Sequence, residues 1–163
     1  MPSGGVIVLN QGNLARAKPY IHEAQAELGA MEDKSGLANA LQCSGYVALL
    51  EGDVPEAKSL IQQAFMISLE AGPRWLLPLC LAGLAGVLAV QGQVEPAVRL
   101  WAAAESLIAS VGSYMDNADR IYYQRTIEPA LPTISGEALE AAHLEGGAMS
   151  MEQAIQYAME FLH

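Results

Sequence analysis

The sequence predicts an all-helical protein built of antiparallel helix pairs that recur every 40 residues. Three segments without gaps carry this prediction, because each has a glycine and, five residues later, an alanine: Gly12 and Ala17, Gly52 and Ala57, and Gly92 and Ala97. A fixed period of roughly 20–50 residues is typical of stacked units that are each too small to bury an apolar face alone. The period gives a truncated first repeat at 6–29, a second at 37–70 and a third at 76–111.

The turn within each repeat has its own signals. Glycine is expected to end the first helix, because it adopts the left-handed conformation without a Cβ clash. Asn13 and Asp53 are the expected N-caps of the second helices, and Asp53 with Glu56 has the spacing of a capping box. Pro55 would lie in the first turn of its helix, where the missing N–H needs no partner.

Small and large residues alternate as close helix packing requires. The repeated alanine, Ala57 in the second repeat, and the glycine Gly45 of the preceding helix are expected to let the two helices of a pair approach closely. Trp101 is expected to fill space between neighbouring repeats as a wedge.

The forty-residue rhythm stops after Gly112, and residues 116–163 are predicted to form capping helices for the last repeat. The first candidate helix runs from Asp116 to Leu131, and Ser135 is the expected cap of a second that ends at Gly147. Ser150 and Gln153 have capping-box spacing before an amphipathic stripe that ends at Leu162. The whole chain, 1–163, is therefore predicted to be one domain.

Composition excludes several classes of function. Hydrophobic residues make up 52% of the chain and charged residues 16%, as expected for a packed helical protein. The formal charge of −10 and the dispersed cations argue against direct nucleic-acid binding. The apolar stretch 75–90 is too short for the ~20 residues of a membrane span, and no signal peptide precedes it. The expected location is the cytoplasm, with Cys43 and Cys80 as reduced core residues.

No pattern of catalytic or metal-ligating residues is evident, so the sequence predicts a non-enzyme without cofactor or metal. The histidines His22, His143 and His163 are scattered, and the serines occupy caps and turns without a nucleophile elbow. Glu105 stands apart, because it lies among alanines beside Trp101. It is expected to be partly buried and to form a structural ion pair with Arg120 or Arg125.

The repeat positions resemble the tetratricopeptide pattern, with a period above the usual ~34 residues, as in the MalT-like subclass. Two blocks, Leu100–Glu105 and Glu145–Ala158, resemble the end of the helical-repeat region in bacterial LuxR-type transcriptional regulators and related signal-transduction (STAND) ATPases. The resemblance implies a right-handed superhelix that senses or scaffolds beside an ATPase module and an output domain. The sequence has no Walker motif and no helix-turn-helix, so ATP hydrolysis and DNA binding are not carried over.

By analogy with tetratricopeptide repeats, a concave binding face would contain Asn39, Gln42, Tyr46, Leu79, Ala82 and Gly86. The expected partner is a protein, either another domain of a parent chain or a separate one, and a small effector and self-association stay open. The predicted function is that of a protein-contact or effector-sensing module of a larger regulator. Because the chain begins within a repeat, it is expected to come from such a larger protein. The alternatives are a free-standing adaptor and, more remotely, an enzyme without a recognisable motif.

Overall fold

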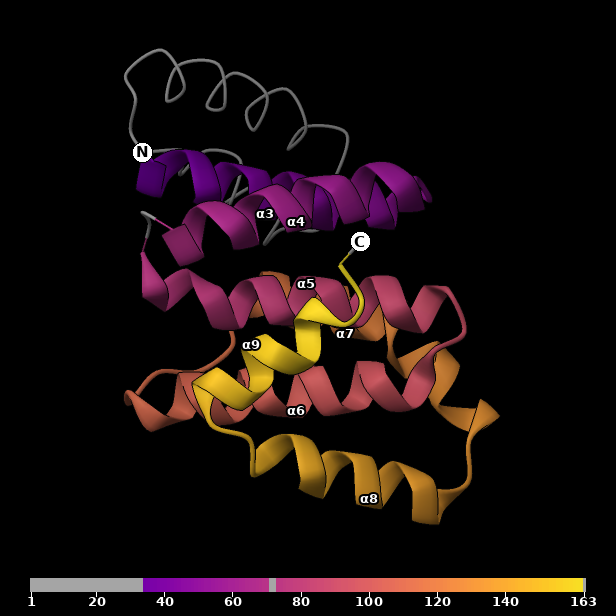
Figure 1. Ribbon diagram of the computed structural model, residues 1–163. Coiled ribbons are helices and arrows are strands. Elements are labelled where there is room, and N and C mark those ends of the chain that lie inside the picture. Colours follow the sequence, from indigo (N-terminus) through magenta and orange to yellow (C-terminus); the bar gives the residue numbers. More distant parts are fainter. Residues whose placement is uncertain (1–33, 71–72, 163) are drawn as a thin grey trace. The chain divides into compact units, whose positions relative to one another are not determined.

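The computed structural model describes residues 34–70 and 73–162, and every regular element in these ranges is a helix (Figure 1). The all-helical class is therefore confirmed for this part of the chain. The elements are α3 (Lys34–Leu50), α4 (Val54–Glu70), η1 (Arg74–Leu76), α5 (Leu77–Val90), α6 (Val94–Ser110), α7 (Asn117–Thr126), η2 (Glu128–Thr133), α8 (Gly136–Gly147) and α9 (Met151–Met159). The predicted first repeat, 6–29 with Gly12 and Ala17, lies outside the described residues.

The chain divides into two compact units at the bond between Cys80 and Leu81. The N-terminal unit is described over 34–70 and 73–80, and the C-terminal unit over 81–162. Helix α5 begins in the first unit and continues into the second, so each part of it is considered with its own unit.

Helices α3 and α4 of the N-terminal unit form an antiparallel pair joined by a glycine turn. Gly52 has a φ of 88°, a left-handed conformation that favours glycine. The Gly52 N–H donates to the Leu49 carbonyl (2.9 Å) and the Asp53 N–H to the Ala48 carbonyl (2.9 Å), so the last carbonyls of α3 are satisfied. The Glu56 N–H donates to the Asp53 carboxylate (3.2 Å), which confirms Asp53 as the N-cap of α4.

The two helices approach most closely where the sequence has small residues. A Cβ added to Gly45 would lie 2.5 Å from Cγ1 of Ile61 and 3.5 Å from the carbonyl oxygen of Ala57. Ala57 itself has no exposed surface. The close approach predicted for Gly45 and Ala57 is thus confirmed, and it leaves no room for a larger side chain at either position.

Replacing Ala57 by leucine is expected to lower the free energy of unfolding by about 1–3 kcal/mol, because the added methyl groups overpack the α3–α4 contact. Urea unfolding followed by circular dichroism measures the change. Gln63→Leu is the matched control, since Gln63 lies on the exposed side of the same helix. Equal stability of the two variants would contradict the packing described.

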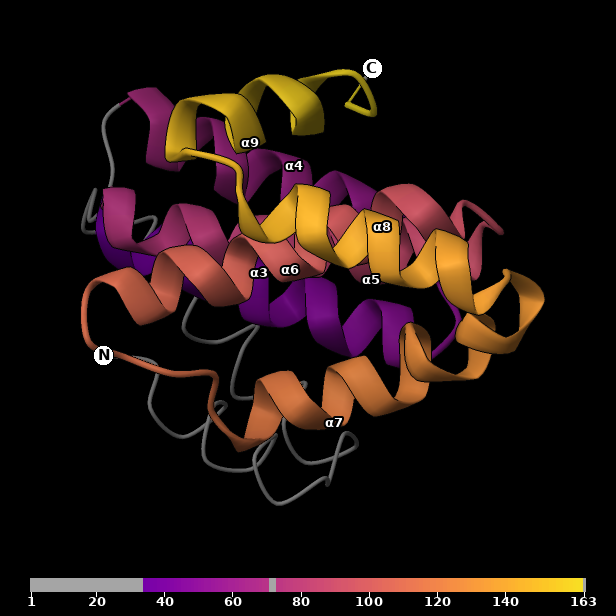
Figure 2. The ribbon, with the colours of Figure 1, turned by 90° about the horizontal axis from the view of Figure 1, so that it is seen from below.

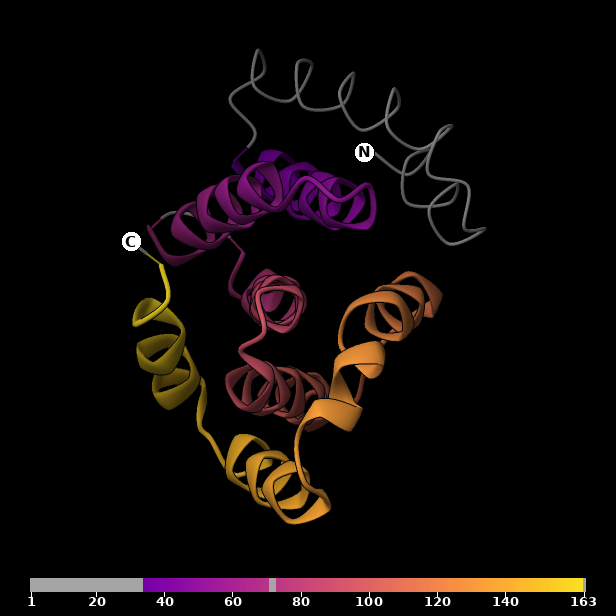
Figure 3. The ribbon, with the colours of Figure 1, turned by 90° about the vertical axis from the view of Figure 1, so that its right-hand side faces the viewer.

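Helix α6 is central to the C-terminal unit. Helix α8 packs along it (Figure 1), and α9 also contacts it. Helices α7 and α9 lie on opposite sides of α6 (Figure 2), an arrangement that is also clear when the helices are viewed along their axes (Figure 3). Residues 81–90 of α5 precede α6 through a turn at Gly92 (φ 86°), and they run antiparallel to it.

The described C-terminal helices begin at the predicted caps. The hydroxyl of Ser135 accepts from the Ala138 N–H (3.1 Å), and Ser150 and Gln153 form the expected capping box. In the apolar stripe of α9, Ala154 and Ala158 are fully buried, whereas Met159 is 41% exposed. The predicted helix from Asp116 to Leu131 is wrong in its end.

Helix α7 stops at Thr126, and the chain continues in the 3-10 turns of η2. Pro129 explains the early end, because it has no N–H for the carbonyl four residues earlier and its ring crowds that turn. The predicted start is confirmed to within one residue, because Asp116 is the N-cap of α7. Asp116 and Asp119 form a capping box in which each side chain accepts from the other's N–H at 3.0 Å.

Tyr122 fills the core between α7 and residues 81–90 of α5. Its ring is fully buried, and its hydroxyl donates to the Gly83 carbonyl at 2.6 Å. A Cβ on Gly86 would lie 2.4 Å from the ring carbon Cε2, so the ring sits directly on the glycine. Burial raises the pKa of Tyr122 well above the usual value for tyrosine. In the N-terminal unit, burial similarly raises the pKa of the Cys80 thiol.

Stability is expected to fall as the pH rises above about 9. The ordinary pKa values are about 8.5 for cysteine and 10 for tyrosine. Because the folded chain holds these two protons to higher pH than the unfolded chain, the stability they contribute is complete below the unfolded pKa values. It is lost as the pH rises toward the folded values. Urea unfolding at pH 7, 9 and 11 measures the fall, which should be shallower for the double variant Cys80→Ala/Tyr122→Phe. The same slope in both proteins would contradict the assignment.

Candidate functional site

The C-terminal unit carries an open cleft of about 810 Å³ between α6, α7 and the second half of α8. Six side chains define its character: Trp101 and Glu105 from α6, Arg120 and Tyr123 from α7, Glu128 from the start of η2, and His143 from α8. Trp101 and Glu105 are one turn apart on α6, and Arg120 and Tyr123 are one turn apart on α7. Two neighbouring helix faces therefore supply most of the chemistry.

An aromatic pair lines this cleft. The rings of Trp101 and Tyr123 have centroids 5.0 Å apart and planes tilted by 43°. Trp101 is only 6% exposed, whereas Tyr123 is partly exposed. Such tilted pairs stabilise the contact between helices and leave the edge and face of the outer ring available to a ligand. In this unit the predicted wedge, Trp101, thus packs against α7.

Two carboxylates, those of Glu105 and Glu128, line the cleft together with Tyr123. Partial burial raises the pKa of Tyr123, and the negative charges of Glu105 and Glu128 raise it further. Both carboxylates are therefore close enough to the hydroxyl for their fields to act on it. They approach it from different elements, since Glu105 comes from α6 and Glu128 from η2. The cleft therefore combines two carboxylates with an aromatic pair.

The expectation for Glu105 is wrong. Its side chain is exposed, and among the described residues it has no ion pair with Arg120 or Arg125. The phase of the helix explains the error, because Trp101, Ala104 and Ile108 form the buried row of α6. Glu105 follows Ala104 by one residue and is turned ~100° from it, toward the cleft that it lines one turn after Trp101.

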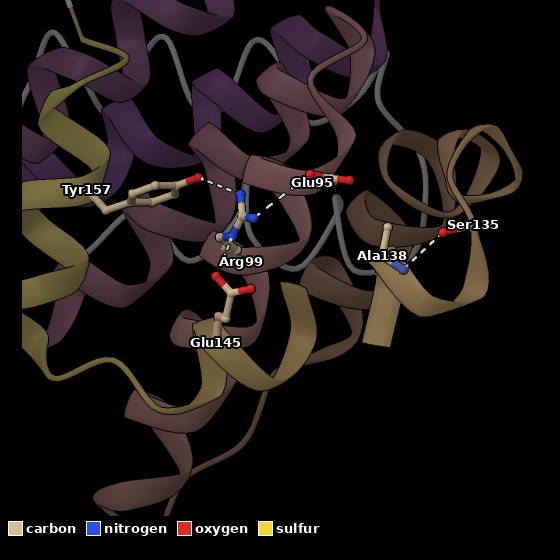
Figure 4. A network of polar contacts seen from close by, with 6 residues as sticks. All are labelled: Glu95, Arg99, Ser135, Ala138, Glu145 and Tyr157. Atoms are coloured by element: carbon tan, nitrogen blue, oxygen red, sulfur yellow. Dashed lines mark hydrogen bonds and ion pairs between the residues drawn. The ribbon is translucent and has the colours of Figure 1, made fainter. Parts of the chain in front are cut away.

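Arg99 holds α8 and α9 against α6 (Figure 4). Its Nε donates to Glu145 at 3.2 Å, and its Nη1 donates to the Tyr157 hydroxyl at 3.1 Å. Nη2 lies 3.9 Å from Glu95 one turn earlier on α6. One guanidinium thus connects three helices, and a planar side chain with five donors is suited to this role.

The same region of α8 lies against the backbone of α6. A Cβ on Gly146 would fall 2.1 Å from the carbonyl oxygen of Arg99, so only glycine fits there. One residue on, the Gly147 carbonyl accepts from the Ser106 hydroxyl at 3.0 Å. Since His143 and Gly147 line the cleft, these contacts fix the α8 wall.

The predicted binding residues occupy two helices. Asn39, Gln42 and Tyr46 lie on α3, with Gln42 and Tyr46 buried and Asn39 partly exposed. On α5, Leu79 is partly exposed and Ala82 is buried, and Gly86 lies under the ring of Tyr122. These residues divide between the two units, so the concave face stays a prediction. Of the predicted structural residues, Gly52 and Gly92 have positive φ, and Ala57 and Ala97 are fully buried.

The cleft itself was missed in the sequence, although one signal was present. Arg120, Tyr123 and Gln124 all line it, at spacings of three and four residues that bring them to one face of α7. Glu128 continues this polar and aromatic stripe into η2. An amphipathic helix with such a face, opposite the buried Tyr122, could have been recognised as one side of a binding surface.

Three or more histidine, cysteine or acidic side chains that could hold a metal ion do not come together anywhere in 34–70 or 73–162. His143 lies in the cleft, whereas His22 and His163 are outside the described residues. None of the described helices is both long and apolar enough to cross a membrane. Comparisons with protein-family models, with curated proteins and with solved structures found no match to this chain.

Proposed function

We propose that this chain is a non-catalytic contact module of a larger bacterial signalling or transcriptional regulator, of the LuxR-type or related ATPase class. The observation that carries the proposal is the recurrence of one pair of helices joined by a glycine turn. The bounds of α4, Val54–Glu70, and α6, Val94–Ser110, differ by 40 residues at both ends, and α3 and α5 end at Leu50 and Val90. This recurrence supports tetratricopeptide-like pairs of the period that the sequence predicts.

The turns between these helices support the same proposal. The N–H groups of Gly92 and Gln93 donate to the Ala89 and Leu88 carbonyls, as those of Gly52 and Asp53 do to Leu49 and Ala48. Identical backbone hydrogen bonds at equivalent positions are expected of a repeat whose glycine has one structural role. In a right-handed superhelix of such pairs, α7, α8 and α9 would form the C-terminal cap. The packing of α8 and α9 on α6 and of Tyr123 on Trp101 agrees with this.

Contact with a partner, in place of catalysis, is favoured by the shape and chemistry of the cleft. It is open and is lined by aromatic and charged side chains, as are many protein interfaces. Aromatic residues in partly enclosed positions commonly contribute most of the binding energy of such interfaces. In this proposal the cleft receives a segment of another protein, or of another domain of the parent chain.

Site-directed photo-crosslinking in the native host tests the proposal. A crosslinking amino acid replaces Gln124, which lines the cleft, or Glu140, which is exposed on α8 outside it. The expected result is a defined protein product from position 124 and none from position 140. A larger regulator as the product supports the signalling role, and a product composed of unrelated proteins supports the free-standing adaptor. Absence of a product at 124, or identical products at both positions, would contradict a contact function for the cleft.

A further inference from the structure

We infer that the cleft selects a basic segment of its partner, with an arginine or lysine side chain placed between Glu105 and Glu128 against the ring of Tyr123. The inference rests on the proposed contact function and names the chemistry of the partner. Three observations carry it: the charge of the C-terminal unit, the two carboxylates that line the cleft, and the ring of Tyr123 that lines it with them.

The charge of the unit favours a cationic partner. Residues 81–163 contain ten carboxylate side chains, three arginines and no lysine, a formal net charge of −7. A field of this sign attracts basic segments during encounter and repels anionic ones. An acidic peptide or a phosphorylated segment would have to overcome this repulsion at every approach to the cleft.

The two carboxylates share one cleft with the ring of Tyr123, so a single cation can meet them there. Glu105 comes from α6 and Glu128 from η2, and both line the cleft that Tyr123 also lines. A guanidinium has donors on more than one side and can bond two carboxylates at once. The carboxylates of both residues are exposed or partly exposed, so a ligand can reach them from solvent.

The ring of Tyr123 adds a second attraction for the cationic group of the arginine or lysine. A guanidinium or ammonium within ~6 Å of an aromatic ring is attracted to its face, and arginine also stacks on it. Tyr123 packs against Trp101, with ring centroids 5.0 Å apart, and this packing restricts its ring. A restricted ring loses little conformational entropy on binding.

Arg120 is the one cation among the six side chains that define the cleft. It is exposed, and in the described part of the chain it forms no ion pair with Glu105 or Glu128. The two carboxylates are therefore available to a ligand. Together with Arg120 they leave the cleft with one net negative charge. Arg120 also gives the cleft a way to orient a bound segment, because it can bind a backbone carbonyl or an acidic side chain of the partner.

Fluorescence of Trp101 measures binding directly. The chain has two tryptophans, so the Trp75→Phe variant reports on Trp101 alone. The probes are capped nine-residue peptides of alternating arginine and glycine, and the same peptide with glutamate in place of arginine. We expect a saturable change in emission with the arginine peptide at 150 mM salt and none with the glutamate peptide.

Charge-matched variants separate the cleft from the charge of the whole chain. Glu105→Gln/Glu128→Gln should weaken binding of the arginine peptide at least tenfold. Glu137→Gln/Glu140→Gln removes the same charge from exposed positions of α8 outside the cleft, and it should change binding less than twofold. Unchanged melting temperatures show that both proteins are folded. Equal losses in the two variants, no saturable binding, or equal binding of the glutamate peptide would overturn the inference.

Competition with the crosslinking experiment distinguishes the two proposals. If position 124 captures a protein that the arginine peptide does not displace, the basic selectivity is wrong while the contact function stands. If the arginine peptide binds through Glu105 and Glu128 but position 124 captures nothing in the host, the selectivity stands and the proposed function is wrong. Displacement of the captured protein by the arginine peptide alone supports both.

Discussion

Replacing Gly146 by alanine is expected to lower the free energy of unfolding by about 3 kcal/mol or more, at the upper end of overpacking effects. The added Cβ would lie 2.1 Å from the Arg99 carbonyl oxygen and 2.7 Å from its carbon. Both are backbone atoms, so no side-chain rotation relieves the clash and α8 must move away from α6. Alanine's better helix propensity, worth ~1 kcal/mol, offsets only part of this cost.

Gly147→Ala is the matched control for that experiment. It changes the neighbouring residue of the same helix, where an added Cβ meets nothing within 4 Å. We expect it to leave the urea midpoint unchanged or slightly raised. Similar midpoints for the two variants would show that α8 does not pack on α6 through Gly146.

Replacing Tyr122 by alanine is expected to cost about 3–5 kcal/mol, as for other large aromatic residues in a core. The side chain is fully buried, lies on Gly86, and donates its hydroxyl hydrogen to the Gly83 carbonyl. Its removal leaves a cavity between α7 and residues 81–90 of α5. Unfolding in urea, followed by circular dichroism, measures the loss.

Tyr122→Phe separates the ring from the hydroxyl. It keeps the packing and removes one hydrogen bond, so it should cost about 0.5–1.5 kcal/mol. A phenylalanine variant as unstable as the alanine variant would place the stability in the hydroxyl, and an alanine variant as stable as the wild type would contradict the burial of the ring.

Local chemistry is what the sequence predicts well. The left-handed turns at Gly52 and Gly92, the caps at Ser135 and Ser150, and the close approach at Gly45 all depend on residues a few positions apart or on the absence of a Cβ. Each of these signals is independent of how distant parts of the chain pack. They suffice to define helix pairs and most of their ends.

The cleft could not be derived in the same way, because it depends on three segments far apart in sequence. Glu105, Glu128 and His143 line one cleft only after α8 has packed on α6 and Tyr123 of α7 has packed on Trp101. The error on Glu105 shows the limit at a single residue, since alanine neighbours suggest burial while the phase of the helix turns the side chain outward. The early end of α7 could have been predicted from Pro129, three residues after Thr126.

Together, the described helices suggest a division of roles in the C-terminal unit. Contacts of Arg99, Gly146 and Ser106 fix α8 on α6. Tyr122 fixes α7 on residues 81–90 of α5. The cleft between them is thus bounded by elements whose positions are set by buried or bonded groups. A binding surface held this way needs little rearrangement when a partner docks, which favours affinity.

Hydrogen exchange of the chain alone and of its complex with the crosslinked partner tests the central claim, that this cleft is the contact site. We predict slower exchange on binding in two segments that line the cleft: 105–115, the end of α6 with the loop after it, and 120–128, which runs from α7 to the start of η2. Exchange in 54–70 of α4 should be unchanged. Protection confined to α4, with 105–115 and 120–128 exchanging as in the free chain, would contradict the claim.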